Sequence, residues 1–501
     1  MAYTICFLVA LAIVVFFLVY GLTHMTSEKY YFNCNKQLGW FEFGNSFAAA
    51  TTSLATVLLF FVILGLDYGL LILWSPITFI FGTVLFNHSM LPKLKEQGFI
   101  TRESDQNSAG NTLGAYIKNR YDSKTVSVFI MLITLLGIFS ILQIELFVGV
   151  QIFRVFLKPE YEETALYIIA FVTFIYTGVG GLNAVVKTDK IQFWFMATVA
   201  IVIVLYYANV INSSNELSLT VNDLLPSRDM LPSRDFNHIF NIEFLALFIN
   251  MFAVNILLIP SLLRNWQLIS ASKNEKEIKK GFTRGAGLTV GISFLFVVFG
   301  ILFFKCNNNC EASMIGILGT MAESNSPLVS YILFPALFGA CLMALLSTVD
   351  SSLLPVVQCL RYDILPNYKN KFYKNWSNPL LIIATFVLTL FLYKVVFKIL
   401  KFDIVNWLFT IFSLVTISSP AIFFACFGKE NLLRTKAMRC SVIVSTILGL
   451  ALALWISIHG NELGNTWFVQ LNTPWAIIVV SLLLFISYWI ISMNLKKSNK
   501  S

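Results

Sequence analysis

The sequence predicts an all-α polytopic membrane protein with about 13 transmembrane helices, and three observations support this fold class. Hydrophobic residues make up 57% of the 501 residues. Charged residues make up 12%, about half the share that is typical of a soluble domain. Apolar runs long enough to cross a hydrocarbon core of about 30 Å recur along the chain. This composition excludes a disordered protein and most soluble enzymes.

The apolar runs divide the chain into candidate spans separated by short polar segments. A helix needs about 20 predominantly apolar residues to cross a bilayer. The candidate spans are approximately 4–22, 43–63, 70–90, 127–152, 165–180, 189–210, 242–263, 282–304, 330–355, 380–397, 403–427, 438–458 and 474–493. Neither the loop 211–241 nor the C-terminal tail is long enough to fold separately. We therefore expect residues 1–501 to form a single transmembrane domain.

The positive charge of the chain indicates orientation. The net charge is +9, and most Lys and Arg residues fall in alternate loops, as the positive-inside rule describes. This places the N-terminus outside and the C-terminus in the cytoplasm of a multi-pass plasma-membrane protein, for which the bacterial inner membrane is expected. The exception is the basic cluster from Lys394 to Lys401, which this topology places outside. Residues 1–22 contain no Lys or Arg, so we expect an uncleaved span rather than a signal peptide.

The charge distribution and the scattered metal-binding residue types exclude several functions. Basic residues that mark topology give no reason to expect a nucleic-acid partner. The four histidines are dispersed along the chain, so no zinc cluster or histidine-based triad is expected. Cys306 and Cys310 lie in a predicted outer loop, where a disulfide is permitted, and the sequence does not decide whether they pair.

The richest set of polar residues within a span lies at 344–352. At about 100° per residue, one helix face carries three of them and one alanine: Ser347, Thr348 and Ser351 with Ala344. Asp350 lies at the border of this face. Carbonyl, hydroxyl and carboxylate oxygens suit a small hard cation. The alternative is that the hydroxyls only bond back to carbonyls one turn earlier.

A second polar stretch, 176–192, is predicted to link two spans on the cytoplasmic side. Its glycines permit tight turns, but the spacing of a Walker phosphate loop is absent. Asp189 has two interpretations. It can follow a Thr188 N-cap and favour the helix dipole, or it can belong to an ion site.

Two further stretches are candidates for a solute cavity. Residues 48–56 contain small and hydroxylated side chains, among them Thr51, Thr52 and Thr56. They predict either close helix packing or a locally unwound helix that exposes carbonyls to an ion and a solute. Gln143 and Glu145 lie within the span 127–152, and a glutamate there should face a cavity or a polar partner.

These motifs resemble the sodium:solute symporter family, which includes the sodium/proline, sodium/glucose and sodium/sialic acid symporters. Residues 176–192 are similar to its signature Y-T-x-x-G-G-x-x-A-V-x-x-T-D-x-x-Q, and residues 346–354 to its helix M-S-T-x-D-S-x-L-L. Residues 266–281 resemble its W-Q-R…E-K-E-A-x-x-G segment, except that Leu268 replaces the arginine and only Arg264 lies nearby. The resemblance covers roughly residues 5–440.

The resemblance implies two inverted five-helix repeats, at approximately 43–210 and 242–427, plus additional helices. It implies a sodium site made by five residues of two helices: the carbonyls of Ala50, Ser53 and Ala344 and the hydroxyls of Ser347 and Thr348. It also implies that Asp189 links to Ser351 and Asp350, as ion-coupling residues or as part of a second sodium site.

Together these features predict a secondary active transporter, not an enzyme, that couples Na⁺ to symport of a small polar organic solute by alternating access. The cavity candidates are Thr51, Thr52, Thr56, Gln143 and Glu145. An amino acid or organic acid is favoured slightly over a sugar, and no organic cofactor is expected. The expected partners are the solute and the lipid bilayer, with the chain as a monomer. The alternatives are a proton-coupled symporter, in which Glu145, Asp189 and Asp350 relay protons, and a non-transporting sensor of the same fold.

Overall fold

The structure is a computed structural model that describes most of the chain. The described residues are 1–23, 28–100, 111–155, 161–213, 242–307, 310, 314–365, 371–395, 404–460 and 466–498. The loop 211–241 of the sequence analysis and residues 396–403 of the basic cluster therefore lie largely or wholly outside the described part. Within it the chain is helical, and its one β-bridge joins Leu38 and Ser272.

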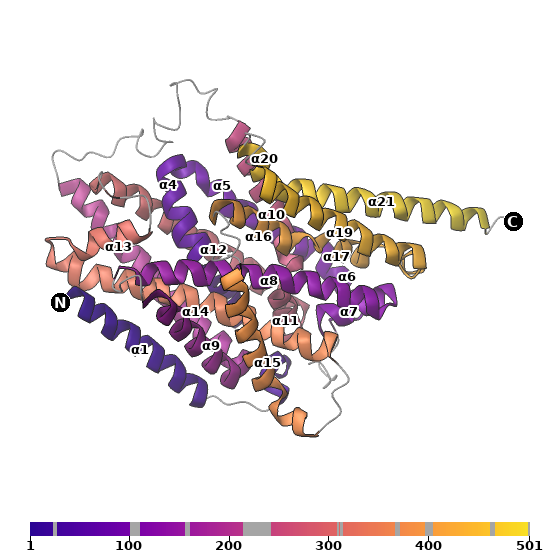
Figure 1. The fold of residues 1–501 in the computed structure, drawn as a ribbon, viewed down its shortest axis with the longest axis horizontal. Coiled ribbons are helices and arrows are strands. Elements are labelled where there is room, and N and C mark those ends of the chain that lie inside the picture. The colour runs from indigo at the N-terminus through magenta and orange to yellow at the C-terminus, as the bar shows by residue number, and fades with distance from the viewer. Residues whose placement is uncertain are drawn as a thin grey trace.

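Figure 1 shows the helices of the described residues in chain order. In the first half they are α1 (Ala2–Thr23), α2 (Glu28–Asn33), η1 (Cys34–Lys36), α3 (Trp40–Thr51), η2 (Leu54–Phe61), α4 (Val62–Tyr68), η3 (Gly69–Leu73), α5 (Trp74–Leu85), η4 (Phe86–Met90), α6 (Leu91–Glu96), α7 (Leu113–Tyr121), α8 (Lys124–Phe153) and α9 (Glu162–Ser213). In the second half they are α10 (Ile242–Ser261), α11 (Leu263–Ala271), α12 (Glu275–Cys306), α13 (Met314–Ala322), η9 (Val329–Leu333), α14 (Phe334–Cys359), η10 (Leu360–Ile364), α15 (Lys371–Tyr393), α16 (Ile404–Thr416), α17 (Ser419–Phe427), α18 (Glu430–Leu433), α19 (Lys436–His459), α20 (Thr466–Gln470) and α21 (Asn472–Ser498).

The predicted all-α membrane class is confirmed, because ten helices in the described residues are long and apolar enough to cross a bilayer. The count of thirteen is not confirmed. The predicted spans without a counterpart among the ten are 43–63, 165–180 and 380–397. The first is interrupted in the structure, the second forms the first part of the longer helix α9, and the third is represented by a shorter apolar helix, Leu381–Tyr393.

Burial separates a central group of helices from a peripheral one. In an apolar stretch of 18 residues, 89% of the residues are buried for the span that contains α14 and 17% for the span that contains α21. The most extensive packing of α3 is against α12 and α9, and that of α14 is against α9 and α8. The N-terminal α1 lies against α9 and α14 on one side, and α19 and α21 lie together on the other (Figure 1). The polar residues of α14 are therefore enclosed by protein.

The predicted span 43–63 is a discontinuous helix. Helix α3 ends at Thr51, and Thr52 leaves the helical conformation with φ −86° and ψ 66°. After Ser53 the chain resumes as the π-helix η2. Two hydroxyls promote the break, since Thr51 and Thr52 both donate to the carbonyl of Ala48, at 3.0 and 2.8 Å. Such bonds compete with the regular pattern of the helix backbone.

The structure replaces the predicted link 176–192 with helix. Helix α9 continues through this segment, and its one non-helical residue is Gly181, with φ 62° and ψ −169°. The interpretation of Thr188 as an N-cap is wrong, because its hydroxyl donates to the carbonyls of Ala184 and Val185 within the helix. The signature stretch thus bends a long helix at one glycine.

The backbone at Gly181 is held by α2. The Tyr31 hydroxyl donates to the carbonyl of Gly178 at 2.7 Å. A Cβ at Gly181 would lie 2.8 Å from the carbonyl oxygen of Tyr31. Both the positive φ and this close approach therefore require glycine.

The open question about Cys306 and Cys310 also has an answer. No disulfide joins these two residues, both of which the structure describes. The Thr320 hydroxyl lies 3.2 Å from the Cys310 sulfur.

We expect Gly181→Ala to lower the melting temperature of the purified protein, because alanine at positive φ costs about 1–3 kcal/mol and its methyl group would press on Tyr31. The control is Gly291→Ala in α12, where a Cβ meets no atom within 4 Å. Equal melting temperatures for Gly181→Ala and the unchanged protein would contradict this account of the bend.

Candidate ion and solute site

The hydroxyl face of α14 lies against the end of α3. The Ser347 hydroxyl lies 2.9 Å from the Ala344 carbonyl oxygen of its own helix and 3.1 Å from the Ala49 carbonyl oxygen of α3. The Thr348 hydroxyl donates to the Ala344 carbonyl at 3.0 Å. Thr348 thus bonds back within its helix, but Ser347 also joins two helices. Their buried oxygens are of the kind that bind small hard cations.

The predicted carbonyl ligands of α3 lie close to this face. Ala50 and Thr348 line the same small cavity, of about 60 Å³. Ala50, Ser53 and Thr348 also line a second cavity, of about 160 Å³. The α3 carbonyl that Ser347 contacts is that of Ala49, one residue before Ala50. The structure therefore brings the predicted residues together at the break, and the individual carbonyl ligands stay a prediction.

Asp189 forms a buried ion pair that the sequence did not indicate. Its Oδ2 lies 3.2 Å from Nη2 of Arg264 and accepts a hydrogen bond from the Ser46 hydroxyl. The same Nη2 lies 3.0 Å from Oγ of Ser46 and also donates to the Ser46 carbonyl. Asp189 is fully buried and Arg264 is 8% exposed. Three elements, α3, α9 and α11, therefore meet in one polar cluster.

Asp350 lies within the electrostatic range of this cluster. Burial lowers the pKa of the Arg264 guanidinium, and the carboxylates of Asp189 and Asp350 raise it. Asp350 Oδ1 accepts a hydrogen bond from the Ser351 hydroxyl at 3.0 Å. Both carboxylates therefore act on the charge of Arg264, and the predicted link between the two aspartates stays a prediction. In the sequence, Arg264 is notable only as the arginine nearest to Leu268, and no residue pattern indicates that it pairs with Asp189.

Glu145 binds the other half of the discontinuous helix. Its Oε2 accepts from the backbone N–H of Leu54 at 3.1 Å, and its Oε1 from that of Ala55 at 3.3 Å. These are the first two residues of η2, where amides have no partner within the helix. Glu145 is 1% exposed. The prediction that this glutamate faces a cavity or a polar partner is met on both counts.

Glu145 also lines the cavity of about 160 Å³ beside the break. The polar residues around it include Thr51 and Thr289, whose hydroxyl oxygens are 2.7 Å apart, and Asn255. Four phenylalanines from three segments form part of its apolar wall: Phe60, Phe61, Phe79 and Phe412. The cavity therefore combines one carboxylate with hydroxyl, amide and aromatic groups.

The remaining cavity candidates are placed differently. Thr52 is buried and not among the lining residues, and its hydroxyl bonds back to Ala48. The Gln143 amide donates to the carbonyl of Thr389 in α15 at 3.0 Å and does not line the cavity. The side chain of Thr56 lies outside the described residues. Thr51 and Glu145 are thus the candidates that the structure places at the cavity.

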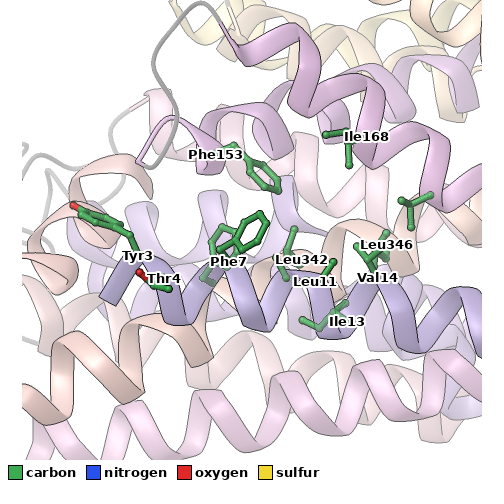
Figure 2. A pocket seen from close by; sticks show the side chains of 13 residues that line it. Tyr3, Thr4, Phe7, Leu11, Ile13, Val14, Phe153, Ile168, Leu342 and Leu346 are labelled. Atoms are coloured by element: carbon green, nitrogen blue, oxygen red, sulfur yellow. The ribbon is translucent and has the colours of Figure 1, made fainter. Parts of the chain in front are cut away.

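The largest cavity described lies elsewhere and has the wrong chemistry for a polar solute. It measures about 710 Å³ and lies between α1 and residues of α8, α9 and α14. Figure 2 shows that its lining is carbon except for the oxygens of Tyr3 and Thr4. A polar solute would lose its hydrogen bonds to water there without replacement. The smaller cavity at Glu145 is therefore the candidate solute site.

The fold and the site define a multi-pass membrane protein whose discontinuous helix lies beside a polar cavity. The sequence model of the sodium:solute symporter family matches residues 31–429. The chain therefore belongs to the sodium:solute symporter family. No curated protein sequence matches the chain.

A solved structure shows the same fold. The chain is similar to a Na⁺-coupled sialic acid symporter in a substrate-bound, outward-open state, with 16% identity, a TM-score of 0.72 and coverage of 97% of each chain. It also matches Mhp1, a nucleobase-cation-symport-1 family transporter, in a closed conformation, with 12% identity, a TM-score of 0.48 and coverage of 94% of this chain and 96% of that one.

We expect Arg264→Gln to destabilise the protein by roughly 3–5 kcal/mol, since it leaves the buried Asp189 carboxylate without its cationic partner. The double variant Asp189→Asn with Arg264→Gln removes both charges and should recover most of this loss. Thermal melting of the single and double variants gives the coupling energy. Additive losses would show that the two side chains do not interact.

Proposed function

We propose that the chain is a secondary active transporter that couples sodium to symport of a small polar organic solute by alternating access. The observation that carries this proposal is the bond from the Ser347 hydroxyl to the Ala49 carbonyl at the end of α3. It brings oxygen atoms of two helices together beside a cavity that Glu145 lines. Family membership and the fold support the same function.

The proposed sodium ligands are the carbonyls of α3 near the break, those of Ala50 and Ser53, with Ala344 and the two hydroxyls of α14. Sodium is a hard cation that prefers oxygen ligands. Binding there would replace the bonds that Ser347 and Thr348 now make to carbonyls. The ion would then join α3 to α14 and favour one arrangement of the two helices.

Asp189 is proposed to act in release of the ion, together with Asp350 and Ser351. Arg264 and Ser46 now hold its carboxylate. Separation of α11 from α9 would free this carboxylate for a cation that leaves the first site. In this mechanism the ion pair between Asp189 and Arg264 blocks the path of sodium to the cytoplasm. When the pair separates, the Asp189 carboxylate becomes available to the ion. Alternatively, Asp189, Asp350 and Ser351 form part of a second sodium site.

The topology proposed from the basic residues has the N-terminus outside and the C-terminus in the cytoplasm of the plasma membrane. In that orientation inward movement of each positive charge contributes about 2.3 kcal/mol per 100 mV of membrane potential. Inverted repeats at 43–210 and 242–427 would supply the two helix groups that rock against each other. We propose that a single chain is the transporting unit.

Two other functions compete with sodium symport. Proton coupling would use Glu145, Asp189 and Asp350, each of which is buried. Uptake driven by a pH gradient without sodium would favour it. A sensor of the same fold would bind its ligand, but the ligand would not accumulate inside vesicles that contain the protein. Uptake into proteoliposomes under sodium, potassium and proton gradients separates the three.

Sodium is expected to raise the melting temperature of the purified protein. We expect Thr348→Ala to increase at least 10-fold the sodium concentration at which half of this rise is reached, because the variant lacks one proposed ligand. Thr348→Ser keeps the hydroxyl and should retain stabilisation by sodium. Thermal melting in sodium against potassium measures the effect. The control is Thr198→Ala in α9, an exposed threonine that bonds back to Trp194. An unchanged sodium response in Thr348→Ala would count against the site.

A further inference from the structure

The start of η2 is a natural site for an anion. The first amides of a helix lack partners within it and form the positive end of its dipole. Phosphates and carboxylates therefore bind at helix N-termini. In transporters with discontinuous helices, such half-helix ends point at anionic groups of the substrate. In most circumstances an organic acid would be the expected solute for such a cavity.

Here the protein supplies the anion itself. Glu145 of α8 accepts from the amides of both Leu54 and Ala55, and its side chain is fully enclosed. A substrate carboxylate would have to displace Glu145 from these amides or lie next to its negative charge. Like charges that approach in a buried site repel strongly because the effective dielectric constant is low. The arrangement therefore disfavours an acid at this position.

The other residues around the cavity favour a positively charged group. Of the described side chains that line it, Glu145 is the one that carries a charge, and none is basic. A buried carboxylate is stabilised when a cation lies beside it. The aromatic rings of the wall, which include Phe60, Phe79 and Phe412, attract cations through the negative faces of their π systems. The carboxylate and the aromatic rings thus both favour a cation in the cavity.

The size of the cavity limits the solute. Its volume of about 160 Å³ corresponds to about five water molecules at their share of the liquid volume, about 30 Å³ each. A compact molecule with a few carbon atoms and one polar end fits this space. Thr289, Ser293 and Asn255 also line the cavity and offer oxygen atoms that can accept hydrogen bonds from a solute.

We propose that the solute of this transporter is a small organic cation whose ammonium group pairs with Glu145. This inference rests on the proposed function and sharpens its solute class. It replaces the slight preference for an amino acid or organic acid, because the site of a substrate carboxylate is occupied by Glu145. The aromatic wall accommodates the alkyl groups that surround such a cation.

The test compares four molecules of nearly equal shape that differ in charge. Choline and 3,3-dimethylbutylamine are cations, 3,3-dimethylbutan-1-ol is neutral, and 3,3-dimethylbutanoate is an anion. Each is titrated against the purified full chain in sodium buffer while thermal melting is followed. We expect at least one cation to raise the melting temperature with a half-effective concentration at least 10-fold below those of the alcohol and the acid.

The variant Glu145→Gln should abolish this preference for the cation. The matched control is Glu323→Gln, the same chemical change at an exposed glutamate, which should keep it. The proposal is overturned if neither cation stabilises more than the alcohol, if the acid stabilises best, or if Glu145→Gln binds the cation as tightly as the unchanged protein. If Glu145→Gln does not melt cooperatively, Glu145→Asp replaces it and should keep the preference with weaker binding.

Sodium titrations without any organic probe separate this inference from the proposed function. If sodium stabilises the protein over potassium and neither cation binds better than the alcohol, sodium coupling stands and the cation assignment fails. If a cation binds through Glu145 and sodium has no effect, the cation assignment stands and sodium coupling fails.

Discussion

The break between α3 and η2 is the constraint on which the rest of the structure depends. Backbone groups inside a membrane cannot bond to water, so an interrupted helix must find partners within the protein. The carbonyl of Ala49 accepts a hydrogen bond from the Ser347 hydroxyl, and the amides of Leu54 and Ala55 donate to the Glu145 carboxylate. Helices α14 and α8 therefore approach the break closely, which explains why polar residues of α14 lie in the most enclosed span.

The two halves of the discontinuous helix are held by different parts of the fold. Before the break, Ser46 joins Asp189 of α9 and Arg264 of α11. After the break, η2 is bound by Glu145 of α8. Since each half has its own charged partner, one can shift relative to the other without loss of both sets of bonds. This arrangement would allow the relative movement of helix groups that we propose for transport.

Much of the fold could be predicted from the sequence, whereas the partners of the charged residues could not. Hydropathy indicated the spans, and spacing placed Ser347 and Thr348 on one face of α14, because both signals are local. The pairing of Asp189 with Arg264 joins residues that are far apart in the chain, and no local pattern encodes it. The prediction of a link at 176–192 was wrong for a related reason, because the contact between Tyr31 and Gly181 is also long-range. This contact fixes one glycine at positive φ, while the flanking residues remain helical. The sequence indicates that contact of Glu145 with lipid would be energetically costly. Its bond to η2 could not be predicted, because it depends on where the span 43–63 is interrupted.

Ion and solute would use different chemistry on the two sides of one break, and this explains how they could be coupled. The proposed sodium ligands are carbonyls at the end of α3 and hydroxyls of α14, whereas the proposed solute site is defined by the carboxylate that binds the first amides of η2. Two cations in neighbouring sites repel each other, so electrostatics alone would oppose their joint binding. Glu145 offsets this repulsion because its negative charge lies beside the cavity that Ser53 and Thr348 also line. Cooperative binding of sodium and an organic cation would therefore depend on Glu145 as well as on the geometry of the break.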